Sequence, residues 1–210
     1  MRVIFINSGI LAILIIIVMA ILISTDWFST LISGVGKRKV IIYLILILFT
    51  FYLNLPITNG WKVSIGGFII PLITYLKLVK GIKEEKIYLL SATILLGATY
   101  FLFKEIIRLD PILLFWDELY QLSLILVLII LIIASSLKYK ITLFFGGMLL
   151  GEFIFNYHHR NDVLVILLGN DQFKDLFWLG LIQIFFFYYV FMAIKQGIKR
   201  ISNINIIKIR

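Results

Sequence analysis

The amino-acid sequence predicts an all-α fold, a polytopic transmembrane bundle of about seven helices with the N-terminus outside the cell and the C-terminus inside. Three observations lead to this prediction. The 210-residue chain is 62% hydrophobic and only 15% charged, with a mean hydropathy of +1.08. Its apolar residues form long continuous runs, and its basic residues gather in alternate connections between them. A soluble domain carries about a quarter charged residues, so most water-soluble folds are excluded.

Each apolar run is expected to be a transmembrane helix, which needs about 20 apolar residues to cross a bilayer. Because hydrocarbon offers no partner to backbone N–H and C=O groups, a spanning segment must satisfy them internally, as a helix does. We expect one integral membrane domain over residues 1–210 and no soluble domain. The expected spans are Ile10–Ile23, Val40–Leu55, Val63–Val79, Ile87–Phe103, Leu119–Leu137, Ile141–Tyr157 and Leu176–Ile194.

The charged residues predict the orientation of the bundle. When the connections are assigned to alternate sides, 14 of the 20 basic residues fall on one side and six on the other. Positively charged loops stay in the cytoplasm, so the richer side is the inner one. Eight of the 11 acidic residues fall on the outer side. The net charge of +9 therefore reflects membrane topology, and we expect no nucleic-acid partner.

The C-terminal segment, residues 195–210, is expected to be a basic amphipathic tail in the cytoplasm. Isoleucine recurs there at helical spacing among basic residues. Such a helix lies on an anionic lipid surface with its apolar face in the interface, and a partner-binding helix is the alternative. The side chains expected to contact inner-leaflet lipids are Lys195, Lys199, Arg200 and Lys208.

Several kinds of chemistry are excluded or lack support. The chain has no cysteine, which excludes disulfides, iron–sulfur centres, thiolate zinc sites and cysteine nucleophiles. It has no GxSxG elbow, no GxGxxG fingerprint and no P-loop. It also lacks the paired repeats that carriers tend to show. The sequence therefore favours a non-enzymatic protein without a cofactor.

The best polar candidate site lies at the outer end of the sixth span. Glu152 stands inside an apolar stretch, and an ionisable residue within a span is a functional candidate by default. Asn156 and His159 follow on the same helical face. Gly147 and Gly151 precede it at a small-xxx-small spacing, which lets a neighbouring helix approach closely. Because acids and amides gather at this end, we expect a polar outward-facing pocket. Its candidate residues are Glu152, Asn156, His159, Asp117, Asn54 and Gln183.

Glu152 has a second, purely structural interpretation. A carboxylate one or two turns from the membrane surface reaches water, and it can pair there with a basic residue of the outer side. The basic residues available for such a pair are Lys104, Arg108 and Arg160.

The two adjacent histidines are candidate metal ligands. His158 and His159, with Asp162 and Glu152, offer ligand types that suit zinc. Their spacing does not match the HExxH helix of a metalloprotease. Adjacent histidines also point to different helix faces, so only one of them joins the row of Glu152. We expect interfacial histidines and no bound metal.

Two further stretches predict local structure on the outer side. Asp110 and Pro111 form a good helix start, since Asp caps free N–H groups and Pro fits the first turn. A helix from Pro111 to Leu137 would be about 40 Å long, so its first two turns would stand in the outer interface. The apolar run Val163–Leu168 is too short to cross a bilayer, and we expect it to lie in the interface or to form a re-entrant turn.

Three short stretches also carry a family likeness. They are Val63–Phe68 with the sequence Val-Ser-Ile-Gly-Gly-Phe, the pair Asp110-Pro111, and the run Gly147–Glu152. Each resembles the corresponding part of the YphA-like membrane proteins, and the likeness extends from about Lys37 to Ile194. The resemblance implies a multi-pass protein of the bacterial cytoplasmic membrane, and it supplies no catalytic residue.

Three functions remain compatible with these patterns. The leading hypothesis is a non-enzymatic membrane protein whose outer pocket binds a small solute, a lipid headgroup or a partner protein. The first alternative is the substrate-capture subunit of an importer for vitamins or other small solutes, although such subunits usually have six spans. The second alternative is an intramembrane metal-dependent hydrolase that uses Glu152 and His159.

Overall fold

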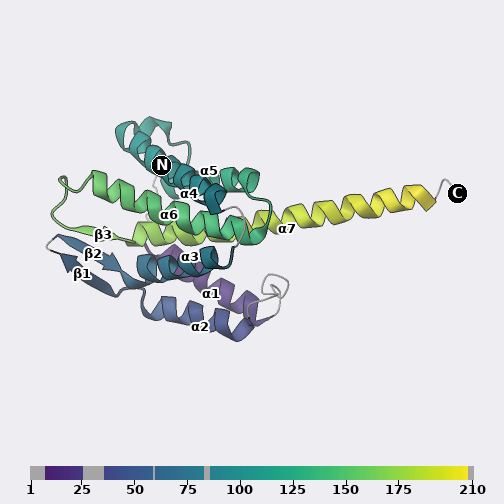
Figure 1. The fold of residues 1–210 in the computed structure, drawn as a ribbon, viewed down its shortest axis with the longest axis horizontal. Coiled ribbons are helices and arrows are strands. Elements are labelled where there is room, and N and C mark those ends of the chain that lie inside the picture. Colours follow the sequence, from purple (N-terminus) through teal and green to yellow (C-terminus); the bar gives the residue numbers. More distant parts are fainter. Residues whose placement is uncertain (1–7, 26–35, 59, 83–85, 208–210) are drawn as a thin grey trace.

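A computed structural model describes residues 8–25, 36–58, 60–82 and 86–207, and these residues form seven α-helices with a small sheet at one end (Figure 1). The helical character of the chain is thereby confirmed. In chain order the helices are α1 (Ile10–Ser24), α2 (Lys37–Phe49), α3 (Ile70–Lys80), α4 (Lys86–Leu109), α5 (Glu118–Ile133), α6 (Leu137–His158) and α7 (Asp171–Ile207).

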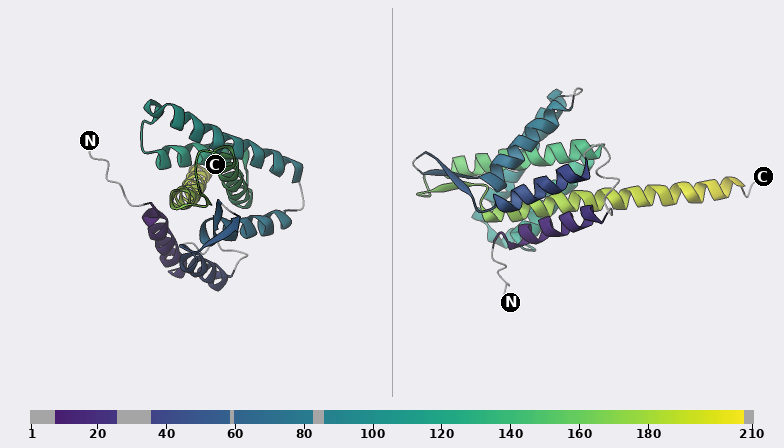
Figure 2. Two further views of the ribbon diagram at one scale, coloured as in Figure 1. Left: turned by 90° about the vertical axis from the view of Figure 1, so that its left-hand side faces the viewer. Right: turned by 90° about the horizontal axis from the view of Figure 1, so that it is seen from below.

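Helices α6 and α7 occupy the centre of the bundle. Helix α6 contacts α3, α4, α5 and α7, and α7 also contacts α1 and α5. Seen along the long axis, α1, α2 and α3 lie on one side of this central pair, and α4 and α5 lie on the other (Figure 2). Buried side chains of all seven helices join in one hydrophobic core. Beyond the bundle, α7 continues as a single long helix toward the C-terminus (Figure 1).

A three-stranded sheet, absent from the all-α prediction, closes one end of the bundle. Its strands are β1 (Asn54–Thr58), β2 (Trp61–Ser64) and β3 (Ile166–Leu168), in the order β1-β2-β3. Strands β1 and β2 form an antiparallel hairpin, and β3 pairs with β2 in parallel. The expectation of an interfacial or re-entrant segment in this region missed the third strand, whose residues Ile166 and Leu168 pack in a small buried cluster with Val63.

The hairpin shortens the second expected span, and the sequence contains the reason. Pro56 has no N–H group to continue a helix, and it restricts the preceding residue to extended backbone. Asn59-Gly60 is a two-residue hairpin signal, and Gly60 has a φ of 97°. Helix α2 accordingly ends at Phe49, and the expected continuation to Leu55 is wrong.

The third expected span is also interrupted. Its first residues belong to β2, and a π-helix, η1 (Ile65–Ile69), follows before α3 begins. The hydroxyl of Ser64 accepts a hydrogen bond from the N–H of Gly67 at 3.2 Å, which caps the start of η1. Pro71 lies in the first turn of α3, a position where proline is common because its fixed φ suits a helix.

The fifth expected span does not run continuously from Pro111. Asp110 caps only a short 3₁₀ turn, η2 (Pro111–Leu113), by accepting from the N–H of Ile112. The chain then breaks, and Asp117 caps α5 by accepting from the N–H of Leu119 at 3.0 Å. A second Asp cap seven positions on therefore separates one expected helix into two elements.

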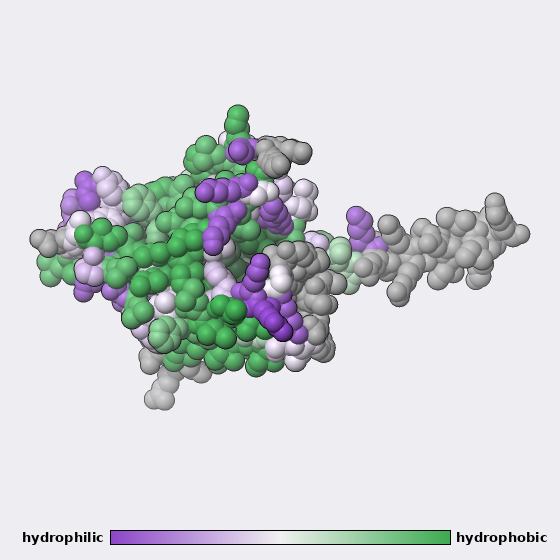
Figure 3. All heavy atoms as spheres, turned by 60° about the horizontal axis from the view of Figure 1, so that its bottom comes forward, coloured by the Kyte–Doolittle hydropathy of each residue, from purple (hydrophilic) through white to green (hydrophobic). Residues whose placement is uncertain are grey.

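The charged and apolar surfaces divide along the length of the bundle. We call the end that carries β1–β3 the sheet end, and the opposite end, where Lys37, Lys80 and Lys138 lie near helix termini, the basic end. A hydrophobic band separates hydrophilic groups at the two ends (Figure 3). Many large apolar side chains of the helices are exposed, among them Leu14, Ile45, Leu95 and Ile132. Exposed apolar area of this extent is typical of a surface that faces lipid.

Length and hydropathy together distinguish two helices from the others. Among the described residues, Lys86–Leu109 and Asp171–Lys195 are long and apolar enough to cross a membrane, while Ile10–Ser24 and Glu118–Ile133 are apolar but shorter. A 15-residue helix such as α1 is about 22 Å long, against a hydrocarbon core of roughly 30 Å.

Candidate functional site

Two buried charges at the start of α7 organise the sheet end. Lys174 and Asp175 are only 3% and 2% exposed. The ammonium group of Lys174 donates to the carbonyl of Phe51, just beyond α2, at 2.7 Å. The carboxylate of Asp175 accepts from the N–H groups of Gly9 and Ala12, at the start of α1, at 2.6 and 2.7 Å. Each charge thus meets the helix end of opposite polarity and fixes it to α7.

Lysines perform the same task at the basic end. The ammonium groups of Lys37, Lys138 and Lys140 donate to carbonyls at the ends of α1, α3 and α5, at Ser24, Gly81 and Ala134 respectively. The last carbonyls of a helix have no partner within the helix, and a lysine satisfies them well. The basic residues that predict the orientation therefore also complete the backbone hydrogen bonding at this end.

Glycines let α4 and α6 approach closely. A Cβ atom placed on Gly147 would come within 2.6 Å of Leu96, and one on Gly151 would come within 2.6 Å of Tyr100. The expected close approach of a neighbouring helix at these two glycines is thereby found, and the neighbour is α4. This contact brings the polar residues near the ends of the two helices together.

Glu152 is completely buried between α4 and α6. Its Oε2 atom accepts a hydrogen bond from the Tyr100 hydroxyl at 2.7 Å and lies 3.7 Å from the ammonium group of Lys104. That ammonium group also lies over the ring of Phe155, 4.6 Å from its centroid. Lys104 is thus one of the three partners that the structural interpretation of Glu152 offered, but the carboxylate is buried and does not reach water as that interpretation assumed. The Oε1 atom has no hydrogen-bond partner among the described residues.

A second polar cluster lies one turn further along the same two helices. The Nε2 atom of His159 lies 3.1 Å from Oε2 of Glu105, and its Nδ1 atom lies 2.9 Å from the carbonyl oxygen of Phe155. Arg108 connects this cluster to the following turn, with Nη1 at 3.2 Å from Oδ2 of Asp162. His159 therefore faces Glu105 of α4, and not Glu152 of its own helix.

The other expected site residues lie in separate surroundings. Asn156 donates to the carbonyl of Glu152, one turn back on α6, at 2.8 Å. Gln183 donates to the hydroxyl of Ser123 at 3.1 Å, between α7 and α5. Asn54 is exposed in β1, and Asp117 is exposed at the cap of α5. The structure thus aligns Glu152, Asn156 and His159 along α6, while the other three residues make contacts of their own.

Sequence reasoning missed Tyr100 and Glu105. Tyr100 stands in an apolar run that is typical of an ordinary span, and its contact with Gly151 is found only in the structure. Glu105 follows Lys104 directly, so the sequence suggests only two oppositely charged neighbours on the surface. The roles of both residues can be recognised only once the relative positions of α4 and α6 are known.

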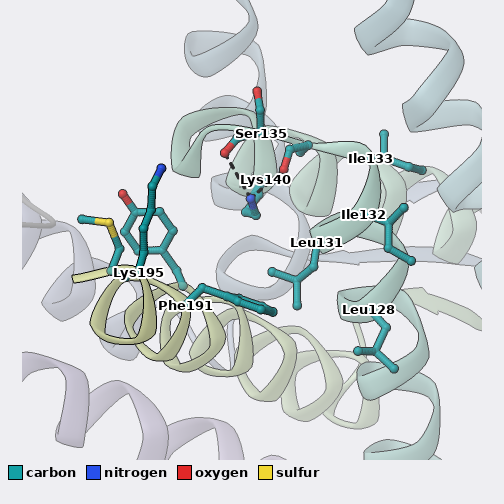
Figure 4. Close-up of a pocket in the computed structure, with 11 residues that line it drawn as sticks. Leu128, Leu131, Ile132, Ile133, Ser135, Lys140, Phe191 and Lys195 are labelled. Carbon is teal, nitrogen blue, oxygen red and sulfur yellow. Dashed lines mark hydrogen bonds between the residues drawn. The ribbon is translucent and has the colours of Figure 1, made fainter. Parts of the chain in front are cut away.

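A hollow lies elsewhere, at the basic end. It has a volume of about 540 Å³ between the end of α5, the start of α6 and the middle of α7. Leu128, Leu131 and Phe191 line its apolar part (Figure 4). Lys140 of α6 and Lys195 of α7 line the part away from Leu128, with a gap between their ammonium groups (Figure 4). A smaller hollow of about 270 Å³ lies beside Trp116 at the sheet end. The six expected site residues line neither hollow.

Comparison with known proteins decides the family. The family model for YphA-like integral membrane proteins matches residues 34–206, which is most of the chain. The chain belongs to the YphA-like integral membrane protein family. The resemblance seen in the sequence is thereby confirmed, and so is the membrane character. No curated protein and no solved structure matches the chain.

The Val63–Phe68 stretch of this YphA-like protein now has a structural reason. A Cβ atom on Gly66 would lie 3.1 Å from backbone atoms of Thr50 and Phe51 at the end of α2. One on Gly67 would lie 2.5 Å from the carbonyl oxygen of Gly169. The two glycines let η1 lie directly against two other backbone segments, so they help to hold the sheet end together.

Proposed function

We propose that this YphA-like protein is a non-enzymatic, multi-pass protein of the bacterial cytoplasmic membrane that binds an anionic phospholipid of the inner leaflet. In this proposal it has about seven spans, with the N-terminus outside and the C-terminus inside. The sheet end then faces outward and the basic end lies at the cytoplasmic surface. The hollow between α5, α6 and α7 is the lipid site, and it is the single observation that carries the proposal.

The size and position of the hollow support a lipid as its occupant. Its volume of about 540 Å³ lies within the roughly 300–1,000 Å³ typical of ligand sites. It opens among the exposed apolar side chains Leu128 and Ile132 of α5 and Phe191 of α7. A ligand that enters from this side comes from the membrane and must be apolar over most of its length.

The charge distribution supports an anionic headgroup. Among the described residues, Lys140 and Lys195 are the charged residues that line the hollow, and no acidic residue lines it. Lys140 donates to the carbonyls of Ala134 and Ser135, which orients its ammonium group. Lys195 is exposed and free to turn toward a ligand. With the phosphate between the two lysines, an acyl chain extends along α5 toward the hydrocarbon core, as it does in the surrounding leaflet.

The lipid proposal is tested with the delipidated full-length protein in nanodiscs. Anionic phosphatidylglycerol is compared with zwitterionic phosphatidylcholine, and bound lipid is counted by native mass spectrometry. We expect phosphatidylglycerol to be retained in preference. Lys195→Gln should lower this preference several-fold, because near-surface lysines attract anionic lipid by about 1 kcal/mol each. Leu128→Trp should lower the retention of both lipids, because the indole fills the apolar part.

Matched controls separate the hollow from the general surface. Lys86→Gln removes an exposed lysine of the basic end that does not line the hollow. Leu95→Trp enlarges an exposed apolar residue of α4. Both variants should retain phosphatidylglycerol as the unmodified protein does. Equal retention of the two lipids, or an equal loss in Lys86→Gln and Lys195→Gln, would overturn the proposal.

The outward-facing solute pocket remains a second candidate function. It is favoured by the Oε1 atom of Glu152, a buried acceptor without a hydrogen-bond partner among the described residues. Its test is given below with the other consequences of Glu152. No interaction among the described residues specifically favours the importer-subunit alternative. The structure also argues against the hydrolase alternative, because His159 faces Glu105 and not Glu152.

A further inference from the structure

Three side chains at the sheet end place potential metal-ligating atoms close together. Glu105, His158 and His159 each offer one such atom, and these atoms lie within 4.8 Å of one another. Glu105 lies in the last turns of α4, His158 ends α6, and His159 is the C-cap of α6. The packing of α4 on α6 therefore assembles a set that is scattered in the sequence.

We propose that Glu105, His158 and His159 bind a divalent transition-metal ion, with zinc as the best match. The orientation of His159 is the first support. Its Nδ1 atom lies 2.9 Å from the carbonyl oxygen of Phe155. A carbonyl only accepts, so Nδ1 carries a hydrogen, and in the neutral ring Nε2 then presents its lone pair to the cluster. Metal-binding histidines are held in this way, with the second ring nitrogen donating to a carbonyl.

The spacing between His159 and Glu105 is the second support. His159 is only 8% exposed, and Nε2 lies 3.1 Å from Oε2 of Glu105. Within the described part of the chain, neither atom has a hydrogen-bond partner. Two lone pairs at this distance repel unless a proton or a metal cation lies between them. Ligands at about 2.0–2.1 Å from a tetrahedral zinc lie about 3.3 Å apart, which matches the observed spacing.

The ligand types select the class of ion. Two imidazoles and one carboxylate suit zinc and neighbouring transition metals, whereas magnesium and calcium prefer oxygen ligands throughout. His158 is exposed, so the ion enters from the solvent at the sheet end. Three protein ligands leave one tetrahedral position for water or for a further ligand. His158 is held in place by an edge-to-face contact with Phe101.

The charged side chains around the site predict how its metal affinity changes when one of them, Arg108, is removed. Nε of Arg108 lies 3.9 Å from Oε1 of Glu105, and Nη1 of Arg108 pairs with Asp162. Lys104, the other cation nearby, is directed toward Glu152. Glu105 therefore offers Oε1 to Arg108 and Oε2 to the ion. Arg108 competes with the ion for the charge of Glu105, so removal of Arg108 should strengthen metal binding.

The test uses the chelator-stripped full-length protein in detergent. Co²⁺ is the spectroscopic probe, and Zn²⁺ and Mg²⁺ are added in competition. We expect one equivalent of Co²⁺ with the absorption of a tetrahedral ion, displaced by Zn²⁺ but not by Mg²⁺. Glu105→Gln and His159→Gln should each weaken Zn²⁺ binding by about tenfold or more. Arg108→Gln should strengthen it.

The controls distinguish a metal site from a structural ion network. Glu152→Gln alters a buried carboxylate of the adjacent cluster and should leave the Co²⁺ spectrum unchanged. Lys195→Gln should also leave it unchanged, because the metal proposal does not depend on the lipid site. If the folded protein binds no Co²⁺, or if Glu105→Gln and His159→Gln bind it as the unmodified protein does, the proposal is wrong. If Arg108→Gln loses thermal stability without a gain in Zn²⁺ affinity, Glu105 serves only in an ion pair.

Discussion

At the scale of single residues, the protein uses buried charges to satisfy helix ends. Lys174 and Asp175 cap α2 and α1, and Lys140 caps α5. A helix end inside a membrane protein has little access to water, so an unpaired carbonyl or N–H group there costs about 1–3 kcal/mol. Charged residues that the sequence alone would place on the surface therefore serve as hydrogen-bond donors and acceptors for the backbone at helix ends.

Glu152→Gln tests the most deeply buried carboxylate. The amide keeps the size of the side chain but removes the charge opposite Lys104, which is only 8% exposed. We expect the unfolding free energy to fall by about 1–3 kcal/mol, because Lys104 loses its charged partner. Thermal unfolding in detergent measures this change, with Asp117→Asn as the exposed control.

The same variant tests the outward-facing pocket. A metabolite panel is screened for ligands that raise the thermal midpoint of the unmodified protein. If Glu152 contributes to a solute pocket, Glu152→Gln should lose that ligand-dependent rise, while Asp110→Asn, at an exposed cap outside the candidate residues, keeps it. A panel in which no ligand shifts the midpoint would count against the pocket.

At the scale of elements, the sheet end depends on η1 lying against two backbones. Gly67 is the tightest point, where a Cβ would lie 2.5 Å from the Gly169 oxygen and 2.8 Å from Cε of Lys174. We expect Gly67→Ala to destabilise the protein by about 1–3 kcal/mol, because neither the backbone nor a buried lysine can move freely. The thermal midpoint measures the loss. Gly36→Ala, where no atom lies within 4 Å, should be neutral. Equal midpoints for both variants would show that η1 shifts without cost.

The same elements show how far the sequence predicts the fold. Helices α4 and α6 are predicted to within six residues at each end, because continuous apolar runs and flanking charges mark them well. Strand β3 is not predictable in this way, since Ile166–Leu168 is an apolar run whose partner β2 lies in a distant part of the chain. The β1–β2 hairpin can be predicted from the sequence, because Pro56 and Gly60 are local turn signals. The apolar residues on both sides of it favour a helix instead, and the expected spans followed them.

The candidate site divides in the same manner. The spacing of Glu152, Asn156 and His159 along one helix is a local property, and the sequence predicts it. The partners Tyr100 and Glu105 belong to another helix, and their placement depends on the register between α4 and α6. Periodicity within one segment carries no information on that register.

At the scale of the whole molecule, the orientation in the membrane is the prediction on which the lipid proposal depends. The chain has no cysteine, so single cysteines report accessibility without background. Asn161→Cys lies at the sheet end and Lys80→Cys at the basic end, and both positions are exposed. In right-side-out membrane vesicles, we expect an impermeant maleimide to label Asn161→Cys at once. Lys80→Cys should react only after the membrane is opened. The opposite pattern would reverse the topology and place the lysine-rich hollow in the outer leaflet.

The parallel pairing of β2 with β3 has a consequence for biosynthesis. Four helices, α3 to α6, separate the two strands in the chain. During translation the hairpin leaves the ribosome early, yet its inner strand keeps an open edge until the sixth helix has been inserted. An unpaired edge is a template for aggregation. A chain that stalls before Ile166 therefore exposes the edge of β2. The sheet can close only when β3 has been made, that is, when six of the seven helices are already inserted.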